Sequence, residues 1–258
     1  MKTAAFQAFL IARAVWIELS RKRGVYVAVL LMALFVVGAV SARIVGVDKP
    51  SVGTFLLNLG LSLSYYAAHI LTLLLAAGQL PNEIENRTLY PLLAKPVSRG
   101  VVLFGKWAAC SLAGCAVFIA LGLVAWIAAP KMEAYDSAML LQMLAAMPLS
   151  IALLAALSIL FSLVWSRGVA LVLLALIFVA GNQIARFLAR ALPPVIRGAA
   201  DWIGGYVPNF SNLNLITRYT DGIGPLANSQ LGGLLLYSLI FLSASLALSS
   251  RMFDRRPL

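Results

Sequence analysis

Six apolar runs, each about as long as a bilayer is thick, limit what this chain can fold into. They cover residues 25–45, 54–80, 107–128, 139–165, 169–188 and 231–249. About 20 apolar residues in a helix cross the hydrocarbon layer, where backbone polar groups have to be paired within their own segment. Only 11% of the residues are charged, against about 25% in soluble domains. We therefore predict an all-α, polytopic membrane protein with one transmembrane domain over residues 1–258.

Residues 1–23 are apolar but carry one polar stripe. The residues on this narrow helical face are Gln7, Glu18, Arg21 and Lys22, with Arg13 at its edge. This pattern predicts an amphipathic helix that lies in the membrane interface. A cleaved signal peptide ending near residues 40–42 is the alternative, but its apolar region would be only about 7 to 15 residues long. We expect residues 25–45 to remain as the first span.

Lysine and arginine residues predict the orientation of the chain. With a cytoplasmic N-terminus, thirteen of the 20 fall on the cytoplasmic side and seven on the outer side. Short cytoplasmic loops carry the excess of these residues in membrane proteins. We therefore predict that both termini are cytoplasmic. The net charge of +11 is interpreted as orientation signals and contacts with lipid head groups rather than as a nucleic-acid surface.

Two stretches differ from ordinary spans. Residues 189–230 contain Pro193, Pro194, Gly204 and Gly205, which break the apolar pattern, so we expect an outer segment that lies in the interface or re-enters the membrane. Its asparagine-rich part, residues 206–214, forms either a gate at the outer mouth or Asx turns. Residues 108–114 are mostly small, which is compatible with close helix packing.

Motifs for catalysis are missing from the sequence. The one histidine, His69, lies within the second run, without HExxH or G-x-S-x-G, and Gly105-Lys106 is not part of a phosphate-binding G-x-x-x-x-G-K-[ST] loop. We expect no enzyme activity, catalytic residue, cofactor or metal in this chain. His69 is interpreted as a hydrogen-bonding residue between helices, with a functional role as the alternative. Cys110 and Cys115 are interpreted as packing residues.

A polar passage, residues 78–106, separates the second and third runs. It contains NEIENRTLYPLLAKPVSR at residues 82–99, followed by Gly105-Lys106. This passage closely resembles the first cytoplasmic loop of the ABC transporter type-2 permease family. An acidic residue, a Thr, a Leu-Leu pair, a Pro, a Ser/Thr-Arg and a Gly-Lys recur there in this order. The interfacial helix, the six spans, the short fourth-to-fifth hairpin and the broken outer segment agree with the same family.

The resemblance implies a permease subunit, and its direction of transport is expected to be export. In this family the loop forms a coupling helix that docks into a separate cytoplasmic ATPase subunit, which binds ATP and Mg. The residues that would make this docking surface are Glu83, Ile84, Glu85, Arg87, Thr88, Leu89, Pro91, Leu92 and Leu93. The resemblance also implies a second permease copy, as a homodimer or a related chain, and a place in the bacterial cytoplasmic (inner) membrane.

Physical chemistry supports this docking reading but leaves alternatives open. Ile84 and Leu89 belong to an apolar edge, and Glu83, Glu85 and Arg87 add charges that would set the register of a bound partner. The same segment is also compatible with a solvated loop that only sets topology. At the level of function, a membrane scaffold that recruits a cytoplasmic partner and an ATP-independent carrier or channel remain open. The apolar spans favour a lipid-like, amphipathic or peptide cargo over a small ion.

Overall fold

The structure is a computed structural model in which residues 2–20, 30, 33–34, 37–38, 50–85, 98–128, 137–191 and 208–255 are described. Its helices are α1 (Lys2–Ser20), α3 (Pro50–Glu85), α5 (Arg99–Ala128), α6 (Ser137–Val164), α7 (Arg167–Ala191), α9 (Phe210–Leu213), α10 (Ile216–Thr220) and α11 (Asn228–Asp254). All regular secondary structure in the described ranges is helical, which confirms the predicted all-α class.

Four helices in the described part of the chain are long and apolar enough to cross a membrane. They are Gly53–Glu85 in α3, Arg99–Ile127 in α5, Ser137–Val164 in α6 and Asn228–Asp254 in α11. These four correspond to the predicted second, third, fourth and sixth spans. The predicted first span, residues 25–45, lies outside the described residues except for a few isolated positions, so it stays a prediction.

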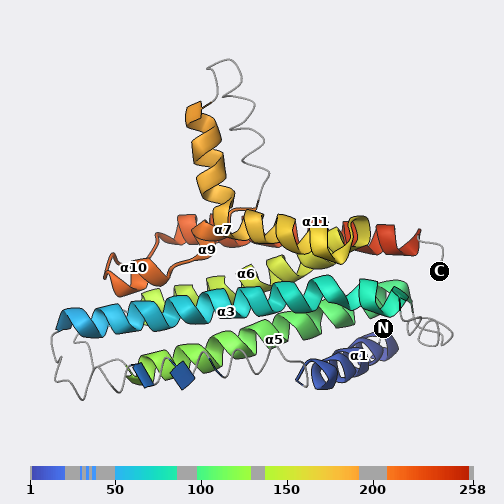
Figure 1. The fold of residues 1–258 in the computed structure, drawn as a ribbon, viewed down its shortest axis with the longest axis horizontal. Coiled ribbons are helices and arrows are strands. Elements are labelled where there is room, and N and C mark those ends of the chain that lie inside the picture. The colour runs from blue at the N-terminus through green and yellow to red at the C-terminus, as the bar shows by residue number, and fades with distance from the viewer. Residues whose placement is uncertain are drawn as a thin grey trace.

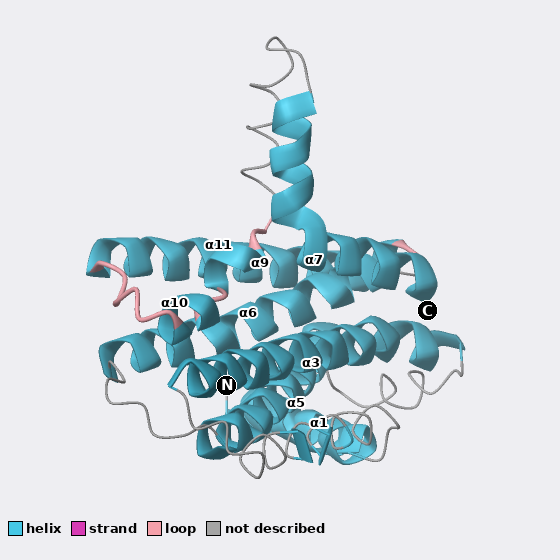
Figure 2. Cartoon of the chain, turned by 60° about the vertical axis from the view of Figure 1, so that its left-hand side comes forward, coloured by secondary structure: helices cyan, strands magenta, loops and turns pink. Residues whose placement is uncertain are grey.

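The predicted fifth span, residues 169–188, is helical and lies in α7. Side chains of α7 are described as far as Val179, and the stretch Arg167–Val179 is apolar, so the full crossing stays a prediction. Ala170, Leu174 and Phe178 pack this part of α7 against the bundle. The later part of α7 projects away from the other helices (Figures 1 and 2).

Two helices extend beyond the predicted apolar runs, both next to the polar passage. Helix α3 continues through Pro81 to Glu85, and α5 begins at Arg99 rather than at residue 107. A proline inside a helix removes one backbone hydrogen bond. Arg167 supports this turn from outside, because its Nη1 donates to Asn82 Oδ1 at 3.3 Å. A β-carbon at Gly78 would meet the Arg167 guanidinium at 3.3 Å, so the glycine admits this side chain.

Helices α3, α5, α6 and α11 run side by side, and α1 lies beside one half of α5 (Figure 1). We call the end of the bundle where α3 stops and α5 starts the loop end. Helices α3 and α6 are the most buried of the four long helices, and α11 is the least. Near the loop end, Val15 of α1, Leu80 of α3 and Val102 of α5 share one apolar core cluster with Phe253 of α11.

A glycine allows a close approach of three helices. A β-carbon at Gly114 of α5 would lie 2.7 Å from Ile151 Cγ2 of α6 and would overlap the hydroxyl oxygen of Thr72 of α3. That hydroxyl donates to the carbonyl oxygen of Ala68 at 2.7 Å, so it has a fixed position. The close packing that the small-residue stretch suggested is therefore found at Gly114.

Amide side chains organise the end opposite the loop end. Gln142 of α6 both donates to and accepts from the backbone of Leu226, at 2.9 and 2.8 Å, which ties α6 to the segment before α11. Asn209 Oδ1 accepts from the Ser211 N–H at 3.1 Å. Asn214 Oδ1 accepts in the same way from Ile216. These are Asx turns, the second of the two arrangements considered for this stretch.

Candidate functional site

Three cationic residues link the ends of different helices at the loop end. Lys106 lies about two turns inside α5, and the residue is 1% exposed. Its ammonium group forms an ion pair with the carboxylate of Glu83, in the last turn of α3. A charge that is removed from solvent needs such a partner. The pair therefore fixes the end of α3 against the start of α5.

Arg99 makes the second of these links. Its Nη1 donates to the carbonyl oxygens of Phe253 at 2.9 Å and Asp254 at 3.2 Å, at the end of α11. The last carbonyls of a helix have no partner within it and carry its negative dipole end, so a guanidinium stabilises them. The Arg99 guanidinium carbon also lies 5.8 Å from the centre of the buried Phe253 ring. Arg167, which bonds Asn82, makes the third link.

The predicted docking residues divide into three groups. Glu83 is paired with Lys106 inside the chain. Ile84 is partly buried and packs on the loop-end core cluster, whereas Glu85 is exposed. The others, Arg87, Thr88, Leu89, Pro91, Leu92 and Leu93, lie outside the described residues, and their role stays a prediction. Residues 82–85 form the last turn of α3, so the passage starts as a continuation of the span.

Sequence reasoning named neither Lys106 nor Arg99 as a site residue, although both stand in the stretch that it compared with the permease family. The pattern that could have identified them is the Ser/Thr-Arg and the Gly-Lys that follow the acidic residue in that family. The hydropathy pattern placed both cations in the polar passage, outside the spans. The structure instead makes each of them a contact between helices.

His69 lies at the centre of a buried contact between α3 and α6. Its Nδ1–H donates to the Tyr65 carbonyl oxygen at 2.8 Å, which leaves Nε2 to accept from the Ser150 hydroxyl, also at 2.8 Å. The ring stacks on Phe178 of α7, with ring centres 4.7 Å apart. A nucleophile, a base and an orienting group form a similar chain in hydrolases. Here His69 and Ser150 are both 0% exposed, so the contact joins helices, as predicted for His69.

Replacing His69 tests this assignment. We expect His69→Leu to lower the free energy of unfolding by about 1 to 2 kcal/mol, because interhelical hydrogen bonds in membranes contribute on that order or less. Chemical unfolding of the purified protein in mixed micelles measures the loss. A cycle with Ser150→Ala should give a coupling free energy near about 0.6 kcal/mol. Zero coupling would contradict the hydrogen bond, and loss of activity in well-folded His69→Gln would indicate a functional role.

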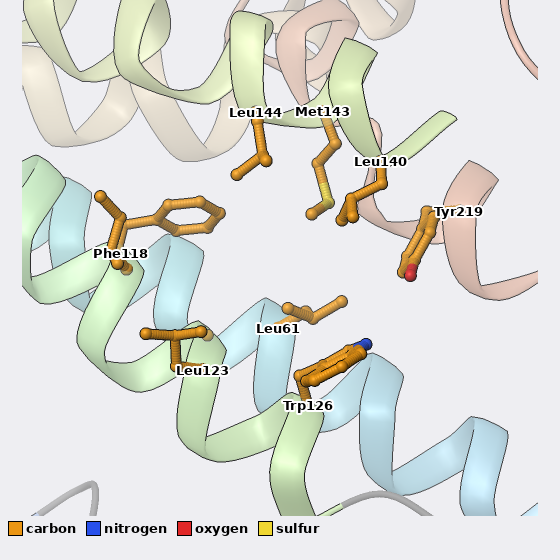
Figure 3. Close-up of a pocket in the computed structure, with 10 residues that line it drawn as sticks. Leu61, Phe118, Leu123, Trp126, Leu140, Met143, Leu144 and Tyr219 are labelled. Atoms are coloured by element: carbon orange, nitrogen blue, oxygen red, sulfur yellow. The ribbon is translucent and has the colours of Figure 1, made fainter. Parts of the chain in front are cut away.

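An apolar pocket opens between the helices away from the loop end. It has a volume of about 250 Å³ and an almost entirely apolar lining. Figure 3 shows side chains from α3, α5, α6 and α10 converging on it, among them Leu61, Trp126, Met143 and Tyr219. Counted from Lys106, its α5 residues lie about 18 to 30 Å further along the helix, at 1.5 Å per residue. Such a lining favours hydrocarbon groups and offers no charge to an ion.

Comparison with known proteins assigns the chain to a family. No curated protein matches the sequence. The family model described as "ABC-2 family transporter protein" matches residues 9–258. The match includes the polar passage, the ion pair and the links at the loop end, and all the long helices of the bundle. Because it covers nearly the whole chain, the protein belongs to the ABC-2 transporter family and is a multi-pass membrane permease subunit of an ABC transporter.

Proposed function

We propose that this chain is one permease subunit of an ATP-powered exporter in a bacterial cytoplasmic membrane, with both termini in the cytoplasm. A separate ATPase subunit would bind and hydrolyse ATP with Mg, and its closure would be passed to the spans through residues 82–99. Two permease copies, identical or related, would form the pathway. Export is alternating access, which requires that nucleotide favour one arrangement of the helices over the other.

The observation that carries this proposal is the form of the loop end. Glu85 is exposed at the tip of a helix that continues without interruption from a span. The turn behind it is held by the ion pair of Glu83 with Lys106 and by the bond of Arg167 with Asn82. A docking surface that stands on fixed helix ends transmits a displacement better than one on a free loop.

The cargo that we propose is lipid-like, amphipathic or peptidic. Lys106 is the buried charge in the described spans, and it is paired with Glu83 near one end. The pocket at the other end has an apolar lining, and it supports a cargo with hydrocarbon groups. Neither feature provides the rings of charges or carbonyl groups with which proteins select small ions.

Affinity capture tests the partner. The tagged chain, extracted gently from its native membrane, is expected to bring down a nucleotide-binding subunit and ATP hydrolysis activity. Glu85→Lys should abolish this capture with no effect on membrane insertion, because charge complementarity at a docking surface is reversed at an exposed position. Asp221→Lys is the matched control, since Asp221 is also exposed but lies near the opposite end of the bundle. The control should capture the ATPase normally.

Two results would contradict the proposal. A captured partner without ATP hydrolysis would favour a membrane scaffold. Transport by the purified chain alone would favour an ATP-independent carrier or channel. If Glu85→Lys captured the ATPase as well as the unmodified chain, Glu85 would not belong to the docking surface.

A further inference from the structure

We propose that Arg99 is a positioning residue that makes α11 move together with the coupling segment. The inference rests on the proposed function, because it concerns how a displacement at residues 82–99 reaches the last span. It assigns a task to a contact that lies outside the expected docking surface. We refer to the contacts of Arg99 and Gly100 with the end of α11 as the Arg99 clasp.

The position of Arg99 explains why it reaches out of its own helix. It is the first residue of α5, where the positive end of the helix dipole disfavours a cation. Its guanidinium instead donates to the final carbonyls of α11, at 2.9 and 3.2 Å. A planar guanidinium can hold two acceptors at once, which a lysine ammonium does with less geometric precision.

Burial makes this contact a firm attachment. Phe253, whose carbonyl accepts from Arg99, is 0% exposed and belongs to the same core cluster as Val102 and Leu103 of α5. Close by, a β-carbon at Gly100 would lie 3.4 Å from Ser250 Oγ of α11. The beginning of α5 therefore meets the end of α11 through a hydrogen-bonded cation, a buried ring and a backbone approach.

The clasp joins α11 to α5, whereas the rest of α11 packs mainly along α6, and this gives the clasp its importance. Helix α11 is the least buried of the four long helices. Its side chains Leu236, Leu239, Ile240 and Leu248 are exposed. By contrast, α3 is already joined to α5 by the ion pair of Glu83 with Lys106. A displacement of the segment before Ser98 thus has a separate route into each helix, and the direct route from the start of α5 into the end of α11 passes through Arg99.

Hydrogen–deuterium exchange of the captured permease–ATPase complex tests this route. In the unmodified complex, ATP with Mg²⁺ should change the exchange of amides at the end of α3 and at the end of α11. Arg99→Ala should lose the change in α11 and keep both the change in α3 and the bound ATPase. Arg99→Lys, which keeps the charge, should lose part of it. Arg251→Ala is the matched control, because Arg251 is an exposed arginine in the last turn of α11, which also contains Phe253 and Asp254.

A covalent link distinguishes positioning from docking. Because a β-carbon at Gly100 would lie 3.4 Å from Ser250 Oγ, the sulfur atoms of Gly100→Cys/Ser250→Cys come within reach of each other, and a disulfide is expected on oxidation. In the Arg99→Ala background this disulfide should restore the ATP-dependent change in α11, and reduction should remove it again. A merely electrostatic role, or a contact of Arg99 with the ATPase, would not be restored by the cross-link.

Failure of the inference and failure of the proposed function give different results. A response of α11 that persists in Arg99→Ala, or that the disulfide does not restore, overturns the role of Arg99 alone. Absence of any captured ATPase overturns the proposed function and the inference with it. If Arg99→Ala does not insert, Arg99→Lys decides, and an undiminished response of α11 in that variant overturns the inference.

Discussion

Glu83→Lys is expected to lose most of its folded population. Lys106 is 1% exposed, and its ammonium group is paired with the Glu83 carboxylate. The substitution removes this partner and puts a second cation beside Lys106. Breaking a buried ion pair from one side costs about 3–5 kcal/mol. The Glu83 side chain is 23% exposed, so we expect the lower limit, about 3 kcal/mol, of the range given for buried pairs. The free energy of unfolding in mixed micelles and the yield of monodisperse protein measure the effect.

The exchanged pair provides the control for this prediction. Glu83→Lys/Lys106→Glu should recover a substantial part of the stability, because it restores opposite charges at the same two positions. Glu85 lies two residues after Glu83 in the same turn and is exposed, so Glu85→Lys should leave the free energy of unfolding nearly unchanged. Equal losses in Glu83→Lys and Glu85→Lys would contradict a structural ion pair. Sequence reasoning treated both glutamates as docking residues, and these variants separate the two roles.

Gly114→Ala is expected to destabilise the bundle, although alanine favours helices. The added carbon would lie 2.7 Å from Ile151 Cγ2 and would overlap the Thr72 hydroxyl. Both neighbours branch at the β-carbon, so they yield only by changing χ1. Overpacking a dense core costs about 1–3 kcal/mol, which exceeds the gain of about 1 kcal/mol from helix propensity. Unfolding in mixed micelles should show a net loss.

The same substitution at Gly122 should have the opposite sign. A β-carbon there would meet only Leu61 Cδ2, at 3.8 Å, which is an ordinary contact. The gain in helix propensity is then not offset, and Gly122→Ala should be neutral or more stable by up to about 1 kcal/mol. If both variants shifted stability in the same direction by the same amount, close packing at Gly114 would not be the cause.

Hydropathy was sufficient to predict the four long helices, because bilayer thickness and backbone pairing leave few alternatives for runs of this length. Near residues 81–106 the helices extend beyond the predicted runs. The second run was predicted at residues 54–80, and α3 continues beyond it through Pro81, where Arg167 and Gly78 support the turn. Lys106 was assigned to the polar passage before the third span, and burial next to Glu83 brings it inside the bundle.

The contacts between helices were largely beyond prediction from one sequence. His69 was expected to bond another helix, but no local pattern identifies Ser150 as its partner, since the two are 81 positions apart. The pairing of Gln142 with the Leu226 backbone spans 84 positions and depends on how α6 meets the segment before α11. Such partners follow from tertiary packing, which periodicity does not encode.

The length of α3 has a mechanical consequence. Its 36 residues extend over about 54 Å, well beyond a hydrocarbon layer of about 30 Å. The close crossing with α5 and α6 at Thr72 lies between two arms, about 20 Å to Glu85 and about 17 Å to Leu61 in the pocket. If the helix tilts about this crossing, its two ends move in opposite directions by nearly equal distances. A small displacement of Glu85 then produces a displacement of similar size and opposite direction at Leu61, in the wall of the apolar pocket.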